Sequence, residues 1–523
     1  MSRTALVLAL LALSLGRAPL SLGADASTLA TAGNGRGVAP CNSCHGAHGE
    51  GMRAAGYPRL AGMPAAYLEE QLDEFASAGR PSTVMQPIAT ALSTGERRAV
   101  AMYFAGLKVS APQARPGPTP VPDQGAAEVA RGAILAATGR WSVGLPPCAA
   151  CHGPEGTGVG TRFPALAGQP EAYLASELHA WQAARRAPGP LGLMRLIASK
   201  LTDADIAAIA AYYAAQPASG GPPGESLLAE ELTPPRQSAA PARVPAATQA
   251  STSTLASGTA AFQPPPRGSE PGGELGQTIR EGERIFLLTD QYAAPYVGNH
   301  LHCSNCHLDA GRRAASAPLW AAYVLYPAYR RKNHHVNTYE ERLQGCFRFS
   351  MNGKAPPLGS PVLVALETYS YWLARGAPTG VQLQGQGYPS VAKPARPADY
   401  ARGAQVYAQS CALCHGPDGA GQSSASHEVV FPALWGAGSF NWGAGMESID
   451  KAAGFIEANM PLALGGTLAP QQAWDVALYI DSQERPQDPR FTGSVAETRS
   501  RFHDSPFSMY GRLVNGRLLG HGD

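Results

Sequence analysis

The strongest constraint on this chain is a Cys-x-x-Cys-His motif that occurs four times in 523 residues. In each copy two thiols and an imidazole stand within five residues, which is the attachment signature of a c-type haem. A redox dithiol or half of a zinc site could account for one copy, but four copies that each place His directly after the second Cys predict four covalently bound haem c groups. The predicted attachment residues are Cys41, Cys44, Cys148, Cys151, Cys303, Cys306, Cys411 and Cys414, and the predicted proximal iron ligands are His45, His152, His307 and His415.

Length and composition indicate several small, loop-rich domains. A chain of this length predicts domains of roughly 100–150 residues. Charged residues are only 15%, whereas 59 glycines and 46 prolines indicate many loops. We expect an all-α fold of four small cytochrome c-type domains, in which haem fills much of each core. The net charge of +2 argues against a nucleic-acid partner.

The N-terminus is typical of an exported protein. Arg3 is followed by an apolar run from Ala5 to Leu15, and Ala24-Asp25-Ala26 has the form of a cleavage site. The alternative is an uncleaved anchor, but the run is short of the ~20 residues that a membrane span needs. We expect residues 1–26 to be a signal peptide and the mature protein to be periplasmic, where c-type haem is attached.

The first half contains an internal repeat. The segment CNSCHGAHGEG…YPRLAGMPAAYLEEQL matches CAACHGPEGTG…FPALAGQPEAYLASEL, and each copy ends in an alanine-rich amphipathic helix. Both terminal helices open with a capping box, Ser93 with Glu96 and Thr202 with Asp205. The repeat predicts two similar haem domains, at residues 27–112 and 123–217, that pack as a pair.

A stretch rich in Pro, Ala, Ser, Gly and Thr divides the chain. It predicts a long flexible linker at residues 218–273, which joins two dihaem modules. The second module contains predicted domains at 274–385 and 395–490. We assign no regular structure to the polar tail at 491–523.

Each domain of the second module is expected to end in a helix. The third domain ends in a helix over residues 361–375, with Ser360 as N-cap and Pro361 at the first helical position. The fourth ends in a helix over residues 470–483.

The distal iron ligands of the first two haems are predicted to be methionines. Met85 lies 40 residues after His45 and Met194 lies 42 residues after His152, at equivalent places in the repeat. Methionine is a common gap filler in cores, but the repeated position favours ligation by both. Methionine opposite histidine gives a relatively high potential and suits electron transfer.

Two methionines compete in the fourth domain. Met460 lies 45 residues after His415, close to the spacing of the repeat, and is followed by Pro461. We favour Met460 as distal ligand, with Met446 as a lining residue or alternate ligand.

The third domain breaks this pattern. Cys346, the one cysteine outside the four motifs, lies 39 residues after His307. A buried inert thiol is the simple explanation. The spacing and the basic neighbours, which favour a thiolate, predict instead that Cys346 ligates the third iron. A thiolate ligand lowers the potential and suits chemistry more than relay.

Basic residues gather around this cysteine in the sequence. Between Asp309 and Lys354, three acidic residues face eight basic ones: Arg312, Arg313, Arg330, Arg331, Lys332, Arg342, Arg348 and Lys354. Some of these must bind haem propionates, and a docking face for a partner is another explanation. Eight exceed what two propionates need, which favours an anionic substrate.

These residues carry a specific resemblance. The segment RLQGCFRFSMNGKAPPLGSPVLVALETYSYWLARGAP, with CSNCHLDAG upstream, resembles the catalytic domain of thiosulfate dehydrogenases. The segment VYAQSCALCHGPDGAG…AGFIEANMPLA is similar to that family's second haem domain. The likeness covers residues 274–490, and the first module resembles the cytochrome c4-like acceptor of such enzymes.

The resemblance implies the coupling of two thiosulfates to tetrathionate, with some members favouring the reverse. It implies that His307 and Cys346 ligate the active-site haem, that Met460 ligates the second, and that Arg342 contacts substrate. The family's conserved stretch falls on Cys346, Phe347, Ser350, Asn352 and Gly353. A second substrate-binding position falls within residues 330–332, and we take Arg331. Some members carry Lys before the distal Met, but this chain has Asn459.

We hypothesise that two thiosulfates enter a basic pocket formed by Arg342, Arg331 and Lys354, with Ser350 and Asn352 lining it. Cys346 ligates iron at rest and leaves it to form a transient adduct. Electrons pass to the first module and then to a soluble or membrane-bound acceptor, such as another cytochrome, a high-potential iron-sulfur protein or a terminal oxidase. Two alternatives stay open: a non-catalytic multihaem carrier, and an enzyme that conjugates thiosulfate to a carrier protein.

Overall fold

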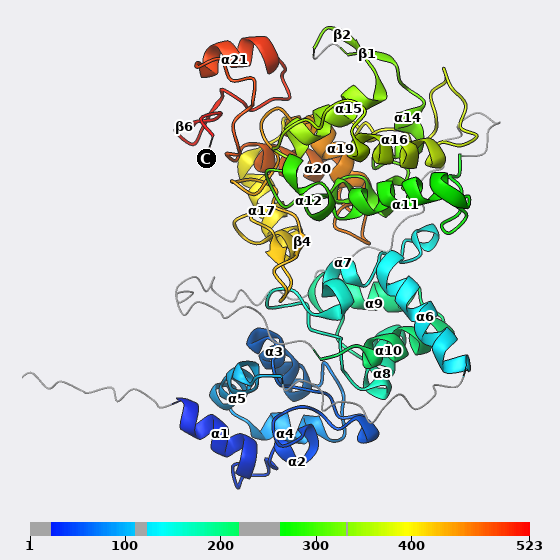
Figure 1. Ribbon diagram of the computed structural model, residues 1–523. Coiled ribbons are helices and arrows are strands. Elements are labelled where there is room, and N and C mark those ends of the chain that lie inside the picture. Colours follow the sequence, from blue (N-terminus) through cyan, green and yellow to red (C-terminus); the bar gives the residue numbers. More distant parts are fainter. Residues whose placement is uncertain (1–21, 110–122, 219–261, 331–332, 523) are drawn as a thin grey trace, which may run out of the picture.

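The computed structural model describes residues 22–109, 123–218, 262–330 and 333–522. Four small helical domains follow one another along the chain, each built around one Cys-x-x-Cys-His motif (Figure 1). Strands in the described parts form three short antiparallel hairpins. This confirms the predicted all-α class. Among the described helices, none is long and apolar enough to cross a membrane.

The first two domains share one plan, as the repeat predicts. The helices of the first are α1 (Leu22–Ala32), α2 (Asn42–His45), α3 (Ala65–Ala76), α4 (Met85–Ala91) and α5 (Thr94–Gly106). Those of the second are α6 (Asp123–Thr138), α7 (Ala149–His152), α8 (Glu171–Gln182), α9 (Leu193–Ala198) and α10 (Asp203–Ala215). In both, the motif histidine ends the short second helix. Residues 1–21 of the expected signal peptide lie outside the described residues, and α1 begins within its last part.

Both predicted capping boxes are present. The Glu96 backbone N–H donates to Ser93 Oγ, and the Asp205 N–H donates to Thr202 Oγ1, each at 3.2 Å. Asp205 is also fully buried. Hydrogen bonds from Arg140, Thr202 and Arg131 hold the pKa of its carboxyl well below the usual range, against the effect of burial.

The third domain is larger and more irregular. It contains α11 (Gly273–Leu287), α12 (Thr289–Tyr292), α13 (Leu308–Gly311), α14 (Leu319–Tyr323), the hairpin β1 (Ala328–Arg330) and β2 (His335–Asn337), α15 (Tyr339–Gly345), a π-helical turn (Cys346–Ser350) and α16 (Pro361–Leu373). Helix α16 matches the predicted helix. Ser360 occupies its N-cap, but its side chain makes no capping hydrogen bond.

The fourth domain packs directly against the third. Its elements are α17 (Tyr400–Ser410), α18 (Ala412–His415), the hairpin β3 (Gln422–Ser423) and β4 (Val429–Phe431), α19 (Ile449–Asn459) and α20 (Pro470–Asp481). Asn441 Nδ2 donates to the Arg348 carbonyl at 2.9 Å and to Asn352 Oδ1 at 3.0 Å. Asn459 Nδ2 donates to the Ala315 carbonyl at 3.0 Å. These bonds between third and fourth domains unite the second module.

Helices cross closely at a glycine in three of the domains. A Cβ atom on Gly132 of α6 would lie 2.0 Å from the Ala208 carbonyl oxygen of α10. Gly282 of α11 faces α16 in the same way, and Gly403 of α17 faces α20, both at 2.1 Å. Only a residue without a side chain allows these backbones to approach so closely.

The tail was predicted to be irregular, and this prediction is wrong. It contains α21 (Val495–Phe502) and the hairpin β5 (Leu513–Val514) and β6 (Arg517–Leu518). Tyr510 and Leu519 are buried against Trp442 of the fourth domain. The polar composition led to the wrong prediction because only a few apolar side chains hold this segment in place. Buried hydrogen bonds provide the remaining stabilisation.

The end of the predicted linker also differs from expectation. Residues 219–261 lie outside the described residues, but those from 262 onward pack on the third domain. The ring of Phe262 lies 5.2 Å from that of Trp320, and Arg312 Nη1 donates to the Pro265 carbonyl at 2.5 Å. The linker therefore ends before residue 262, because its last segment covers the core of the third domain.

Candidate active site and haem pockets

The four motif histidines are oriented in the same way. Each ring places Nδ1 within hydrogen-bond distance of a backbone carbonyl further along the chain. The pairs are His45 with Pro58 at 2.9 Å, His152 with Pro164 at 2.8 Å, His307 with Ala317 at 2.7 Å and His415 with Pro432 at 2.9 Å. A proton on Nδ1 satisfies this bond and leaves Nε2 as a lone-pair donor. That tautomer and orientation fit a proximal iron ligand.

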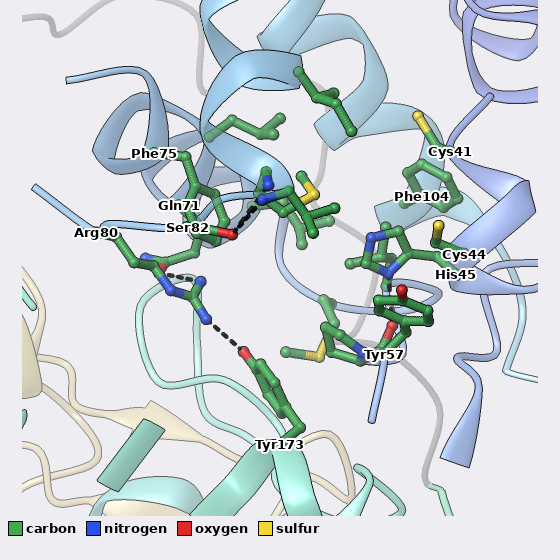
Figure 2. Close-up of a pocket in the computed structure, with 18 of the residues that line it drawn as sticks. Cys41, Cys44, His45, Tyr57, Gln71, Phe75, Arg80, Ser82, Phe104 and Tyr173 are labelled. Atoms are coloured by element: carbon green, nitrogen blue, oxygen red, sulfur yellow. Dashed lines mark hydrogen bonds between the residues drawn. The ribbon is translucent and has the colours of Figure 1, made fainter. Parts of the chain in front are cut away.

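The first domain contains a cavity of about 710 Å³ beside its motif (Figure 2). Cys41, Cys44, His45 and Met85 all line it, so the structure brings the predicted attachment residues and the predicted distal ligand to one space. Met63 also lines the cavity, but its sulfur accepts a hydrogen bond from Gln169 Nε2 at 3.7 Å. The size and the mostly apolar lining fit a haem.

Arginine side chains lie at the margin of this cavity, where the second domain meets the first. Arg80 Nη2 donates to Glu177 at 2.5 Å and to the Tyr173 hydroxyl at 3.1 Å (Figure 2). Arg186 is buried beside it and also binds Glu177. Buried guanidinium groups at the edge of an apolar cavity suit the propionates of a haem.

The candidate distal ligands of the second and fourth domains occupy different settings. Met194 lies in α9, which packs against α8. Met460 directly follows α19 and packs on the same apolar core as Cys411. Met446 contacts that core and also the core of the third domain. Met460 thus belongs to the interior of the fourth domain, whereas Met446 lies at its boundary.

Cys346 begins the π-helical turn that continues α15. Thr338 caps α15 by accepting the Glu341 N–H at 3.2 Å, which fixes the start of the helix. Four residues on, Arg342 points along the same face as Cys346, and its Nη1 donates to Cys346 Sγ at 3.0 Å. Cys346 is the largest cause of the raised pKa of Arg342, which burial opposes.

This pair lies beside the third motif. Cys303 of this motif packs on the same apolar core as Phe347, the residue after Cys346. Burial lowers the pKa of His307 to about 4, and the charge of Arg342 contributes to this shift. The structure therefore brings Cys346 and Arg342 together with the attachment cysteines and the proximal histidine.

Three further substrate candidates, Ser350, Asn352 and Lys354, lie at the end of the π-helical turn or just after it. Ser350 ends the turn, and its carbonyl accepts from Asn299 Nδ2 at 3.0 Å. Asn352 has φ of 46° and binds Asn441 of the fourth domain through its side chain. Lys354 is exposed.

Two of the eight basic residues, Arg312 and Arg313, bind other parts of the structure. Arg312 is buried and donates to the Pro265 carbonyl, and Arg313 Nε donates to Asn459 Oδ1 of the fourth domain at 3.0 Å. Arg330 Nη1 donates to the Tyr326 hydroxyl at 2.5 Å. Tyr326 also raises the pKa of Arg342, although its effect is smaller than that of Cys346. Arg331 and Lys332 lie outside the described residues.

Sequence reasoning missed the tyrosines around Arg342. Tyr326, Tyr339 and Tyr388 all influence the pKa of that guanidinium. Burial raises the pKa of Tyr388 well above its usual value. Tyr388 lies in a Gly/Pro-rich stretch between two domains, where no motif or periodicity could have indicated a role.

Comparisons with known proteins agree with this arrangement. The cytochrome c family model matches residues 129–214, and the model described as cytochrome C oxidase, cbb3-type, subunit III matches residues 398–480. These matches, with the relatives below, show that the four motifs carry covalent haem c.

Both modules have close relatives. The chain is 58% identical over 284 residues to a thiosulfate dehydrogenase of Thiomonas intermedia (strain K12), covering 54% of this chain and 90% of that protein. It is 46% identical over 182 residues to the thiosulfate dehydrogenase electron acceptor of the same organism, covering 35% of this chain and 81% of that protein.

A solved structure resembles the whole chain. It is thiosulfate dehydrogenase (TsdBA) from Marichromatium purpuratum in its as-isolated form, with a TM-score of 0.82 and 44% identity. The match covers 95% of this chain and 99% of that one. The chain therefore belongs to the thiosulfate dehydrogenase family, as an oxidoreductase that joins the dehydrogenase and its cytochrome c4-like electron acceptor in one polypeptide.

Proposed function

We propose that the protein couples two thiosulfate ions to tetrathionate in the third domain and passes two electrons to its first module. The observation that carries this proposal is the 3.0 Å contact between Arg342 Nη1 and Cys346 Sγ beside the third motif. A fixed cation next to a sulfur atom suits a site that must hold and oxidise a sulfur anion.

The charge of the reactants sets the main task of the site. Two thiosulfate dianions join through their terminal sulfurs, so one S–S bond forms and two electrons leave. Arg342, which lies next to Cys346, offsets the repulsion between the two dianions. Arg330 and Lys354 add positive charge further from Cys346. When bound, the haems supply the one-electron acceptors for the two electrons that are released. Ser350 and Asn352 shape the entrance.

The ligand assignments belong to the same proposal. Met85, Met194 and Met460 serve as distal ligands of the first, second and fourth haems, which relay electrons. Cys346 serves as distal ligand of the third haem, in the active site. The common orientation of the proximal histidines, the cavity beside Met85 and the position of Met460 in the core near Cys411 support these roles.

Location and partners are proposed on the sequence. The signal-like segment at residues 1–26 supports export to the periplasm, where the first module delivers electrons to a soluble or membrane-bound acceptor. The reaction is reversible in principle, because the forward direction forms one S–S bond and releases two electrons, and the reverse direction cleaves that bond with two electrons.

The test replaces Cys346 by Gly. The variant should retain four haems, measured by the pyridine haemochrome spectrum and mass, but produce less than about 1% of wild-type tetrathionate, a loss of the size seen when a charge-stabilising group is removed. Near-normal turnover would refute the assignment. A protein-bound thiosulfonate in place of free tetrathionate would instead favour the conjugating enzyme.

A further inference from the structure

A second, smaller cavity lies at the contact between the first and second domains, at the end of the molecule away from the third domain (Figure 1). Its volume is about 120 Å³. This space holds a few waters or one small ion, and it is well below the roughly 300–1,000 Å³ of a cofactor site. The polar side chains that line it all come from the first domain: His48, Glu50, Arg53, Arg59 and Lys108.

The lining of this cavity carries an excess of positive charge. Arg53, Arg59 and Lys108 are opposed by one carboxylate, that of Glu50, so that two positive charges are left over. Glu50 is also engaged elsewhere, because its Oε2 accepts the His48 backbone N–H at 2.7 Å. Two excess positive charges around a space of this size match a small dianion.

Arg59 is the lining residue that most needs a negative partner. It is only 2% exposed, and its Nε has no hydrogen-bond partner within the described chain. Its Nη1 donates to the Ala61 carbonyl at 2.6 Å and its Nη2 to the Ala167 carbonyl at 3.2 Å. Burial lowers its pKa to about 10, and no acidic side chain of the described residues offsets this effect. A buried cation without a counter-charge is costly, and a bound anion would supply that charge.

Arg53 is held in a similar way by the second domain. Its Nη1 donates to the Ala214 carbonyl at 2.7 Å and its Nη2 to the Gly168 carbonyl at 3.4 Å. Carbonyl oxygens carry only a partial negative charge, so they orient the guanidinium without neutralising it. Lys108, two residues after the end of α5, is exposed and lines the cavity from the solvent side.

We propose that this cavity binds a small tetrahedral dianion, of the class represented by sulfate, hydrogen phosphate and thiosulfate. Arg53 and Arg59 hold the ion through guanidinium nitrogens, and Lys108 closes the open side as a point charge. The site lies in the first domain and shares no residue with the proposed active site. It therefore goes beyond the oxidation of thiosulfate and does not depend on it.

The position of Arg59 couples this site to the redox state of the first domain. Arg59 lines the small cavity and also the larger cavity beside Cys41 and His45. A haem in the larger cavity carries one more positive charge when it is oxidised than when it is reduced. The dianion should therefore bind the oxidised protein more tightly, by roughly 5-fold, the lower end of typical coupling between two sites.

Binding is tested on the oxidised full-length holoprotein by isothermal titration calorimetry with sodium sulfate, at an ionic strength held constant with sodium chloride. Wild type should bind sulfate with a Kd of about 1 mM or lower. Lys108→Glu should weaken this binding roughly 10-fold or more, because it reverses one unit charge at the site. Lys108→Arg, which keeps the charge, should remain close to wild type. The matched control is Arg98→Glu, which reverses an exposed charge on α5 outside the cavity and should leave the Kd unchanged.

Two results would overturn the site. One is equal sulfate binding by wild type and Lys108→Glu, because the ion would then occupy another place. The other is no binding of sulfate beyond that of chloride. The source of the ion is distinguished by repeating the titration with phosphate, and with thiosulfate on the Cys346→Gly variant. Tighter binding of thiosulfate would identify the substrate as the occupant, and equal affinities would identify inorganic dianions in general; both results support the site, even if the proposed oxidation of thiosulfate fails.

The coupling is tested by repeating the sulfate titration after the haems have been reduced with ascorbate. The Kd of the wild type should rise by roughly 5-fold on reduction. The same comparison in Arg98→Glu should give the same ratio. Equal affinities of the oxidised and reduced wild type would overturn the coupling.

Discussion

At the scale of single residues, the proposed chemistry depends on one spacing. Arg342 and Cys346 are four positions apart on α15 and the π-helical turn, so that the guanidinium reaches the sulfur. Thr338 fixes the start of the helix, and three tyrosines lie close enough to Arg342 to raise the pKa of its guanidinium. A cation in such a setting acts on a sulfur anion more strongly than an exposed one.

Replacing Arg342 by Gln should therefore impair catalysis more than folding. We expect kcat/KM for thiosulfate to fall by roughly 100-fold or more, the usual effect of removing one charge-stabilising donor. The control is Arg375→Gln, which removes an exposed arginine at the end of α16. Steady-state kinetics with an artificial acceptor measure both. Equal kinetics in the two variants would exclude a substrate role for Arg342.

At the scale of secondary structure, the domains depend on glycine at helix crossings. Gly132, Gly282 and Gly403 each face the backbone of the helix that closes the domain. The neighbouring atom is a carbonyl oxygen of a helix, which cannot rotate away as a side chain can. The crossing in turn holds the terminal helices around the haem pocket.

Gly282→Ala should destabilise the third domain by about 1–3 kcal/mol, the usual cost of overpacking a core. Its added Cβ would lie 2.1 Å from the Ala365 oxygen and 2.7 Å from Tyr369 Cβ. Differential scanning calorimetry of the holoprotein measures the lowered Tm. Gly95→Ala in α5, where nothing lies within 4 Å, should cause no loss. A normal Tm for Gly282→Ala would show that the helices can separate freely.

At the scale of the whole molecule, buried charges fasten the tail to the fourth domain. His503 Nε2 donates to Asp488 Oδ2 at 2.9 Å, and its ring stacks 4.2 Å from Tyr510. Ser508 Oγ donates to Glu447 Oε2 at 2.7 Å. Burial alone would lower the pKa of His503, but hydrogen bonds to Asp488 and Glu447 outweigh it and raise the pKa above 6.5.

Attachment of the tail should therefore depend on pH. Stabilisation by His503 is complete below pH 6.5 and is lost as the pH rises through the raised pKa. Hydrogen bonds from His503 and Arg490 hold the pKa of Asp488 below 3.8 despite its burial, so its contribution is complete above pH 3.8 and is lost at lower pH. Limited proteolysis of the tail should be slowest between these values. His503→Gln should remove the rise in the proteolysis rate on the alkaline side. If that rise persists in the variant, another group causes it.

Local patterns determined much of this molecule. The haem motifs, the repeat and both capping boxes depend on residues a few positions apart, so the number of haems, the helical class and Cys346 as the exceptional cysteine could be predicted. The order of the tail could not, because it depends on contacts with residues of another domain, such as Glu447 and Trp442.

The sequence by itself determined how many redox groups the protein binds and in which domain its chemistry is proposed, because covalent attachment and helix capping are local. Only the tertiary structure decided which basic side chains surround Cys346, that Tyr388 approaches them, and that the second haem site meets the fourth. The physical reason is that these contacts join loops far apart in the chain. The geometry of these contacts depends on side-chain packing and on glycines that let two backbones approach closely. Neither feature produces a periodic pattern in the sequence.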